Sequence, residues 1–176
     1  WFPWGIPGHS CSGYGDSIQF ELISKNHYQI LEDRMAIFHT GKQRLSSNVN
    51  SVWMNALYTK KGFKKHLEKL HYAYEFREGL RLQQWDRVLD SVKKYCEIRT
   101  SLSPDYIKGS EKLIEQADRN GCVAFPQGAG GGGAVLIITD NPLNLVQFKE
   151  NISELYKEIK IKVKSKGHEL YNCWGD

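Results

Sequence analysis

The stretch that decides the fold is Pro126-Gln127-Gly128-Ala129-Gly130-Gly131-Gly132-Gly133-Ala134, a glycine run between two apolar segments. Cys122-Val123-Ala124-Phe125 before it is a predicted short strand. Ala134-Val135-Leu136-Ile137-Ile138-Thr139 after it is a continuous β-rich run, which is typical of a central strand. Glycine loses more backbone entropy on folding than any other residue. The run is therefore either a flexible hairpin loop or a place where the backbone approaches a ligand closely.

The glycine run does not match the common phosphate loops. No Lys-Ser or Lys-Thr follows it, which excludes a Walker loop. A strand rather than a helix comes next, which excludes a dinucleotide fingerprint. Successive N–H groups in such a loop can still form an anion-binding nest. The residues alone leave both interpretations of the loop open.

Apolar periodicity predicts the other elements. Residues 17–31 are expected to hold a short strand or two, and Met35–His39 is expected to be a buried strand. Spacings of three and four predict amphipathic helices with one face on a core. Their stripes are Leu45, Val49, Val52 and Ala56, then Phe63, Leu67, Leu70 and Tyr74, then Leu82, Trp85, Leu89, Val92 and Cys96.

Capping signals place two more helices. Ser103-Pro104-Asp105 predicts a helix start and Asn120-Gly121 its end. Asp140-Asn141-Pro142 predicts the start of a helix whose stripe is Leu145, Phe148, Ile152, Leu155 and Ile159. Residues 159–164 alternate with period two, which favours an edge strand with outward lysines. The order strand, helices, strand, strand, helix, strand predicts an α+β fold with a small, mainly antiparallel sheet covered by helices.

Composition excludes several classes of protein. The chain has 176 residues, 40% of them hydrophobic and 25% charged, which is typical of a soluble globular protein. A net charge of +4 with both signs mixed does not point to nucleic acid. No stretch has the roughly 18–20 apolar residues of a membrane span. Cys11, Cys96, Cys122 and Cys173 form no C-x-x-C pair, so we expect free thiols in the cytoplasm and no metal site.

Two segments carry a specific resemblance to the GHMP kinases. The third motif of that family, Gly-Ala-Gly-Gly-Gly-Gly before a hydrophobic strand, is similar to residues 128–133. The L-fucokinase branch has a segment Tyr-Thr-Gly-Lys-x-Arg-Leu-Ala-x-Asn, which resembles His39-Thr40-Gly41-Lys42-Gln43-Arg44-Leu45-Ser46-Ser47-Asn48. The heptose-phosphate kinases carry a related Thr-Gly-x-x-Arg.

Two shorter segments extend the resemblance. Residues 99–104, Arg-Thr-Ser-Leu-Ser-Pro, look like the Lys-x-Leu-(Ser/Ala)-Pro of the same branch. Gly13-Tyr14-Gly15-Asp16-Ser17 occupies the place of a family Gly-Trp-Gln-Asp-Gln, although both glutamines are replaced. Together the matches cover roughly residues 13–174. They imply a residual N-terminal-domain segment and linking loop at 1–34 and a ferredoxin-like GHMP C-terminal domain at 35–176.

The resemblance implies phosphoryl transfer from ATP, with Mg²⁺, to the hydroxyl of a sugar or sugar phosphate. Asp16 would be the catalytic base. The substrate and nucleotide would meet Thr40, Gly41, Lys42, Arg44 and the loop residues Gly128, Ala129, Gly130, Gly131, Gly132 and Gly133. The family's first two motifs are absent, so an N-terminal kinase domain is the expected partner. A noncatalytic binding or regulatory module is the alternative. An RNA-binding ferredoxin-like domain is disfavoured, because residues 134–139 lack aromatics.

Overall fold

One antiparallel sheet forms the centre of the computed structural model, which describes residues 25–42 and 46–161. Its strands are β1 (Met35–His39), β2 (Val123–Pro126), β3 (Ala134–Ile138) and β4 (Lys157–Ile159), in the spatial order β2-β3-β1-β4. Ile138 of β3 lies opposite Met35 on one side and Val123 on the other. The glycine run thus joins two neighbouring strands.

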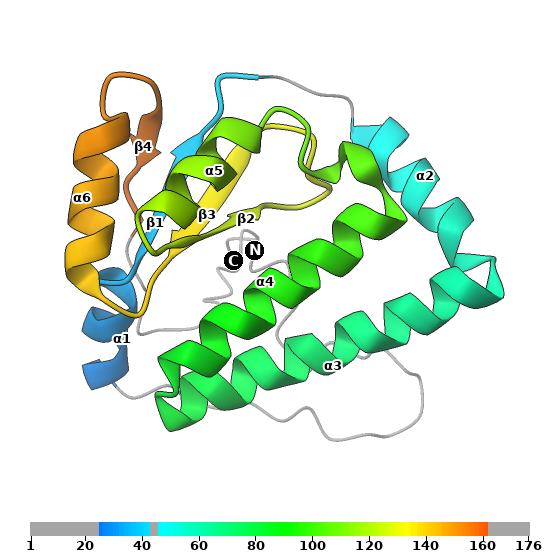
Figure 1. Cartoon of the computed structure of the whole chain (residues 1–176), viewed down its shortest axis with the longest axis horizontal. Helices are drawn as coiled ribbons and strands as arrows, with labels where there is room; N and C mark the ends of the chain where they lie inside the picture. Colours follow the sequence, from blue (N-terminus) through cyan, green and yellow to red (C-terminus); the bar gives the residue numbers. More distant parts are fainter. Residues whose placement is uncertain (1–24, 43–45, 162–176) are drawn as a thin grey trace, which may run out of the picture.

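Helices precede β1 and occupy the connections from β1 to β2 and from β3 to β4 (Figure 1). They are α1 (Lys25–Glu32), α2 (Ser46–Leu57), α3 (Lys60–Leu82), α4 (Trp85–Leu102), the 3-10 turn η1 (Pro104–Tyr106), α5 (Glu111–Arg119) and α6 (Pro142–Ile152). The order β-α-β-β-α-β is the ferredoxin-like pattern, enlarged by α2, α3 and α4 between β1 and β2. The α+β prediction with a small antiparallel sheet is confirmed.

Helices pack against both faces of the sheet. The core between the sheet and helices α5 and α6 contains Ala36, Phe38, Leu113, Ala117, Cys122, Ala124, Val135, Ile137, Leu145, Phe148 and Ile152. The core on the opposite face, with α1, α3 and α4, contains Leu31, Met35, Phe76, Val88, Val92, Tyr95, Phe125, Leu136 and Ile138. Burial on both faces explains the continuous apolar run of β3. It also leaves this sheet without the open face on which RNA bases stack.

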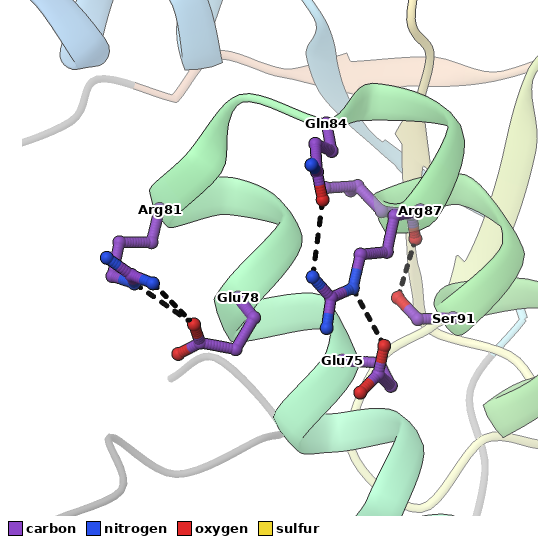
Figure 2. Close-up of polar contacts among 7 residues, drawn as sticks. Glu75, Glu78, Arg81, Gln84, Arg87 and Ser91 are labelled. Atoms are coloured by element: carbon purple, nitrogen blue, oxygen red, sulfur yellow. Dashed lines mark hydrogen bonds and ion pairs between the residues drawn. The ribbon is translucent and has the colours of Figure 1, made fainter.

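The α3–α4 hairpin crosses the lower face of the molecule in Figure 1 and is locked at its turn. Gln83 ends α3 in the left-handed conformation with φ of 56°. Nε of Arg87 on α4 donates to a Glu75 carboxylate oxygen on α3 at 2.7 Å, and Arg81 pairs with Glu78 at 2.8 Å (Figure 2). The Arg87–Glu75 pair joins the two antiparallel helices, whereas the Arg81–Glu78 pair lies within α3.

Helix α3 buries a different face from the predicted one. The predicted stripe is about half exposed, at 54% for Phe63, 51% for Leu67, 50% for Leu70 and 53% for Tyr74. The buried residues are instead Gly62, Lys69, Phe76 and Gly79. The cause is close helix contact at glycine, since a Cβ on Gly79 would lie 2.9 Å from Cγ2 of Val88. A pattern search that counts large apolar residues misses a contact made by glycine.

Two predicted helices have different boundaries. The stripe that joined Leu82 to Trp85 spans two helices, because the chain reverses at Gln83 and Leu82 is 45% exposed. Ser103-Pro104-Asp105 opens only the short turn η1, and Ser103 makes no side-chain cap. Helix α5 begins later, at Glu111. A positive φ of +83° at Gly109 lies between the two segments and prevents one continuous helix.

The two ends of the described region also differ in part. Residues 25–31 belong to helix α1, so the strand expected there is wrong, and residues 17–24 lie outside the described residues. Helix α6 begins as predicted, since Oδ1 of Asn141 accepts the Leu143 N–H at 3.1 Å. It ends at Ile152, and Leu155 is exposed. An edge strand is present as β4, but it overlaps the predicted residues 159–164 only at Ile159, and residues 162–164 lie outside the described residues.

Candidate functional site

The glycine run forms a hairpin loop of defined conformation between β2 and β3. Gln127 N–H donates to the Ala134 carbonyl at 2.9 Å and closes the hairpin. Glycines 128 and 130–133 all have positive φ, the left-handed region that disfavours other residues. The loop is therefore a hairpin, but a hydrogen-bonded one whose path needs glycine.

Tyr106 of η1 anchors this loop. Its carbonyl accepts the Gly131 N–H at 2.7 Å, and its hydroxyl donates to the Pro126 carbonyl at 2.7 Å. A Cβ added to Gly130 would lie 2.1 Å from Cδ2 of the tyrosine ring. The absence of a side chain at Gly130 thus serves the packing of the loop on Tyr106.

The loop also contacts the segment after β1. Thr40 N–H donates to the Gly133 carbonyl at 2.8 Å, and Gly133 N–H donates to the Lys42 carbonyl at 3.3 Å. Thr40 is buried, whereas Gly41 and Lys42 are exposed. The structure therefore brings together the two segments with the most specific family resemblance. Arg44 and Asp16 lie outside the described residues.

Hydrogen bonds limit which loop amides can meet a ligand. The N–H groups of Gly130, Gly131 and Gly133 donate to the carbonyls of Gln127, Tyr106 and Lys42, respectively. Within the described part of the chain, the amides of Gly128, Ala129 and Gly132 donate to no acceptor. An anion beside the loop would meet only these three amides.

A cavity of about 190 Å³ lies next to the loop. It is lined by Trp53 of α2, Lys69 of α3, Tyr95 and Arg99 of α4, Tyr106 of η1, Phe125 of β2 and Gly128 of the loop. Tyr106 is shared by the cavity wall and the loop anchor. The cavity and the glycine loop are therefore parts of one site.

The two cations of this cavity are buried among aromatic rings. Lys69 is 6% exposed, and its Nζ lies 4.8 Å from the centre of the Trp53 ring and 5.3 Å from that of Tyr95. Arg99 is 7% exposed, with Cζ 4.5 Å from the centre of the Trp53 ring and 5.3 Å from that of Tyr106. No carboxylate among the described residues pairs with either cation. Among the described residues, cation–π contacts are the only interactions that offset the desolvation of these two cations.

The polar groups around the cations also lack partners. Burial, and next the charge of Arg99, lower the pKa of Lys69 to about 8. The pKa of His66 is lowered by burial and then by Lys69 and Arg99. Nε1 of Trp53 and Nδ1 of His66 are buried and make no hydrogen bond with a described residue. The cluster thus holds two positive charges and an indole donor without an acceptor.

Sequence patterns did not predict this cavity. Lys69 lies seven residues from both Gly62 and Phe76, and that heptad spacing was the available signal for its burial. The larger apolar residues of the predicted stripe (Phe63, Leu67, Leu70 and Tyr74) gave a stronger periodic pattern and indicated a different buried face. Arg99 appeared only as the first residue of a weak motif.

The described residues offer no metal site. No group of three or more His, Cys, Asp or Glu side chains gathers in the described ranges. Cys96 and Cys122 are free thiols, as predicted. None of the helices within 25–42 and 46–161 combines the length and apolar character that crossing a bilayer requires.

Comparison with known proteins finds similarity in structure only. No protein-family model and no curated protein sequence matches the chain. A Lin0012 protein from Listeria innocua matches with a TM-score of 0.61 and 14% identity, over 72% of this chain and 38% of that chain. Streptococcus pneumoniae phosphomevalonate kinase in complex with phosphomevalonate and AMPPNP matches with a TM-score of 0.58 and 16% identity, over 71% and 39%.

A third solved structure is also a kinase. L. major mevalonate kinase in complex with R-mevalonate matches with a TM-score of 0.57 and 13% identity, over 68% of this chain and 37% of that chain. Both kinases are of the GHMP type. The chain therefore shares a fold found in GHMP kinases, and it spans about two fifths of the length of these structures.

The Tyr106 anchor predicts unequal effects of alanine in the loop. Gly130→Ala combines left-handed strain with overlap on Tyr106 and should lower the free energy of unfolding by roughly 3 kcal/mol. Gly133→Ala is the matched control, because its φ is +78° and nothing lies within 4 Å of the added Cβ. It should cost about 1 kcal/mol. Urea denaturation measures both, and equal losses would contradict the anchor.

The lowered pKa of Lys69 predicts that Lys69→Met stabilises the chain near neutral pH. With a folded pKa of about 8 against an ordinary 10.5, the unfolded chain binds more protons between these values, so wild-type stability rises with pH there. Below pH 8 the lysine is charged in both states and its full desolvation cost remains. Removing the charge should add roughly 2 kcal/mol at pH 7, after discounting for residual solvent contact.

Thermal unfolding of the wild type and the variant from pH 7 to 10.5 measures this difference. The advantage of Lys69→Met should shrink through that interval. Lys64→Met, at an exposed position of the same helix, should show no such trend. A Lys69→Met variant that is less stable than the wild type at pH 7 would contradict the prediction. It would mean that the contacts of the charged lysine contribute more to stability than its desolvation costs.

Proposed function

We propose that this chain is the C-terminal part of an ATP-dependent sugar kinase that resembles the fucokinases and heptose-phosphate kinases. The observation that carries the proposal is the hydrogen-bonded contact between residues 40–42 and Gly133. Residues 40–42 resemble a motif of that branch, and the glycine run resembles the third motif of the GHMP kinases as a whole. The two segments meet within a fold found in GHMP kinases.

The solved neighbours support ATP as the phosphoryl donor. The Streptococcus pneumoniae enzyme holds AMPPNP with phosphomevalonate, and the L. major enzyme holds R-mevalonate. A sugar acceptor is inferred instead from the Thr40-Gly41-Lys42 segment, whose resemblance is to the sugar-kinase branch. Residues 35–176 would be the C-terminal domain, and residues 1–34 would belong to the N-terminal domain and its link. We place the reaction in the cytoplasm.

In the proposed reaction, a sugar hydroxyl oxygen forms a bond to the γ-phosphorus of ATP while the bond to the β–γ bridging oxygen breaks. Asp16 accepts the hydroxyl proton, and ADP leaves. Lys42 and Arg44 contact phosphate or sugar oxygens. The glycine loop forms a wall of the site and offers its unpaired amides.

Mg²⁺ belongs to the proposal only through the ATP chemistry. Its preferred ligands are carboxylate, phosphate and water oxygens. The described residues hold no group of three or more His, Cys, Asp or Glu side chains, so by themselves they do not fit a magnesium site. Its ligands would come from the N-terminal half, together with most contacts to the nucleotide phosphates.

The test is phosphoryl transfer by the natural protein that contains these residues. It is incubated with γ-labelled ATP, Mg²⁺ and a panel of fucose, heptose phosphates and hexoses, in parallel with the 176-residue chain alone. We expect transfer to one of these acceptors by the longer protein and none by the 176-residue chain. No transfer to any acceptor by the longer protein would favour the noncatalytic binding or regulatory module.

The role of Asp16 as the catalytic base is tested by replacing its carboxylate with an amide. In an active protein, Asp16→Asn should lower kcat by about 100-fold or more, because the proton loses its acceptor. Asp90→Asn, at an exposed position of α4, is the control and should leave kcat unchanged. A kcat for Asp16→Asn close to the wild-type value would remove Asp16 from the mechanism.

A further inference from the structure

We propose that Lys69 and Arg99 form a binding site for a phosphate group in the aromatic cavity beside the glycine loop. The proposed kinase reaction assigns no role to these two residues. The site stands on contacts among described residues and does not require that the chain be active.

The first argument is the charge of the cavity. Each cation is less than a tenth exposed, and no described carboxylate neutralises either one. An unpaired buried charge is costly, and two like charges in one cavity add repulsion. Cation–π contacts with Trp53 recover only part of this cost. An anionic ligand would neutralise both charges.

The second argument is the set of polar atoms without partners. The Trp53 indole N–H is buried and has no acceptor among the described residues. Indole donates only, so the group requires an acceptor oxygen. Gly128 also lines the cavity, and its amide donates to no acceptor in the described part of the chain. A ligand with several acceptor oxygens suits these donors.

The third argument is size and charge number. The cavity of about 190 Å³ is several times the ~30 Å³ that one water molecule occupies, so it has room for a larger group. A phosphate monoester carries about −1.5 to −2 at neutral pH, which matches two cations better than one carboxylate does. The planar fork of Arg99 suits two phosphate oxygens, and Lys69 adds a point charge.

The phosphate has two possible carriers. One is a substrate that already bears a phosphate, and the other is the nucleotide. The chemistry of recognition is the same for both, since the cavity would bind the phosphoryl oxygens. Ligands that differ only in the carrier separate the two cases.

Phosphate binding should also change the protonation of Lys69. The titratable groups around it are His66 on its own helix, Tyr95 and Arg99 on α4, and Tyr106 on η1. A bound anion favours the charged lysine and raises its pKa above about 8. Binding near pH 8.5 should therefore take up a proton, which calorimetry in buffers of different ionisation enthalpy detects.

The test is isothermal titration calorimetry on the 176-residue chain at constant ionic strength. The probes are inorganic phosphate, glucose 6-phosphate, glucose and ADP. We expect saturable binding of phosphate with proton uptake at pH 8.5, and no binding of glucose. Tighter binding of glucose 6-phosphate than of ADP would assign the phosphate to the substrate, and the reverse order would assign it to the nucleotide.

Four variants locate the site. Lys69→Met and Arg99→Met should each weaken phosphate binding at least tenfold, because each removes a charge-assisted contact. Lys64→Met should bind like the wild type, since Lys64 is exposed on the same helix. Arg99→Lys keeps the positive charge but lacks the planar guanidinium, so it should bind phosphate with intermediate affinity. This variant still tests the site if Arg99→Met fails to fold.

Two outcomes would overturn the proposal. One is the absence of saturable binding of both phosphate and glucose 6-phosphate. The other is equal affinity in the wild type and Lys69→Met, which would place the anion elsewhere. Both outcomes are measured by binding and not by kinase activity. A failure of the phosphate site can therefore be distinguished from a failure of the proposed function.

Discussion

The hydrogen bond between Gly131 N–H and the Tyr106 carbonyl, at 2.7 Å, is the contact on which the rest of the site depends. Tyr106 is 1% exposed, and its hydroxyl also donates to Pro126 at the end of β2. The same ring packs under Arg99. One residue thus holds the hairpin loop, the sheet edge and the basic cavity in a common geometry. The glycine at position 130 follows from that requirement, because a Cβ there would overlap the tyrosine ring.

The cavity beside this anchor lowers the stability of the fold, because it buries two cations. Packing Lys69 and Arg99 between aromatic rings leaves two desolvated cations without a described carboxylate. An ordinary core position would hold an apolar side chain at lower cost. Natural proteins keep such features mainly where binding or catalysis uses them. This cost is the reason for assigning an anionic ligand to the cavity, whereas the cores on the two faces of the sheet contribute to stability.

Much of the fold could be predicted from the sequence. The strands at Met35–His39 and after the glycine run are continuous apolar segments, and the Asn141 cap is a local signal that needs no tertiary context. The buried face of α3 was missed, because two glycines and a lysine occupy three of its four buried positions and larger apolar residues mark another face. The site was predictable in part. Residues 40–42 and the glycine loop carry motifs, whereas Lys69 becomes a neighbour of Arg99 only through the α3–α4 hairpin.

The central claim is that the cations beside the glycine loop bind an oxyanion. The most direct measurement is a ¹H–¹⁵N NMR titration of the 176-residue chain with inorganic phosphate at constant ionic strength. The account predicts that the Nε–H of Arg99, the indole N–H of Trp53 and the amide of Gly128 shift along one saturable curve. Small, non-saturating shifts spread over the exposed lysines, with Arg99 unchanged, would contradict it.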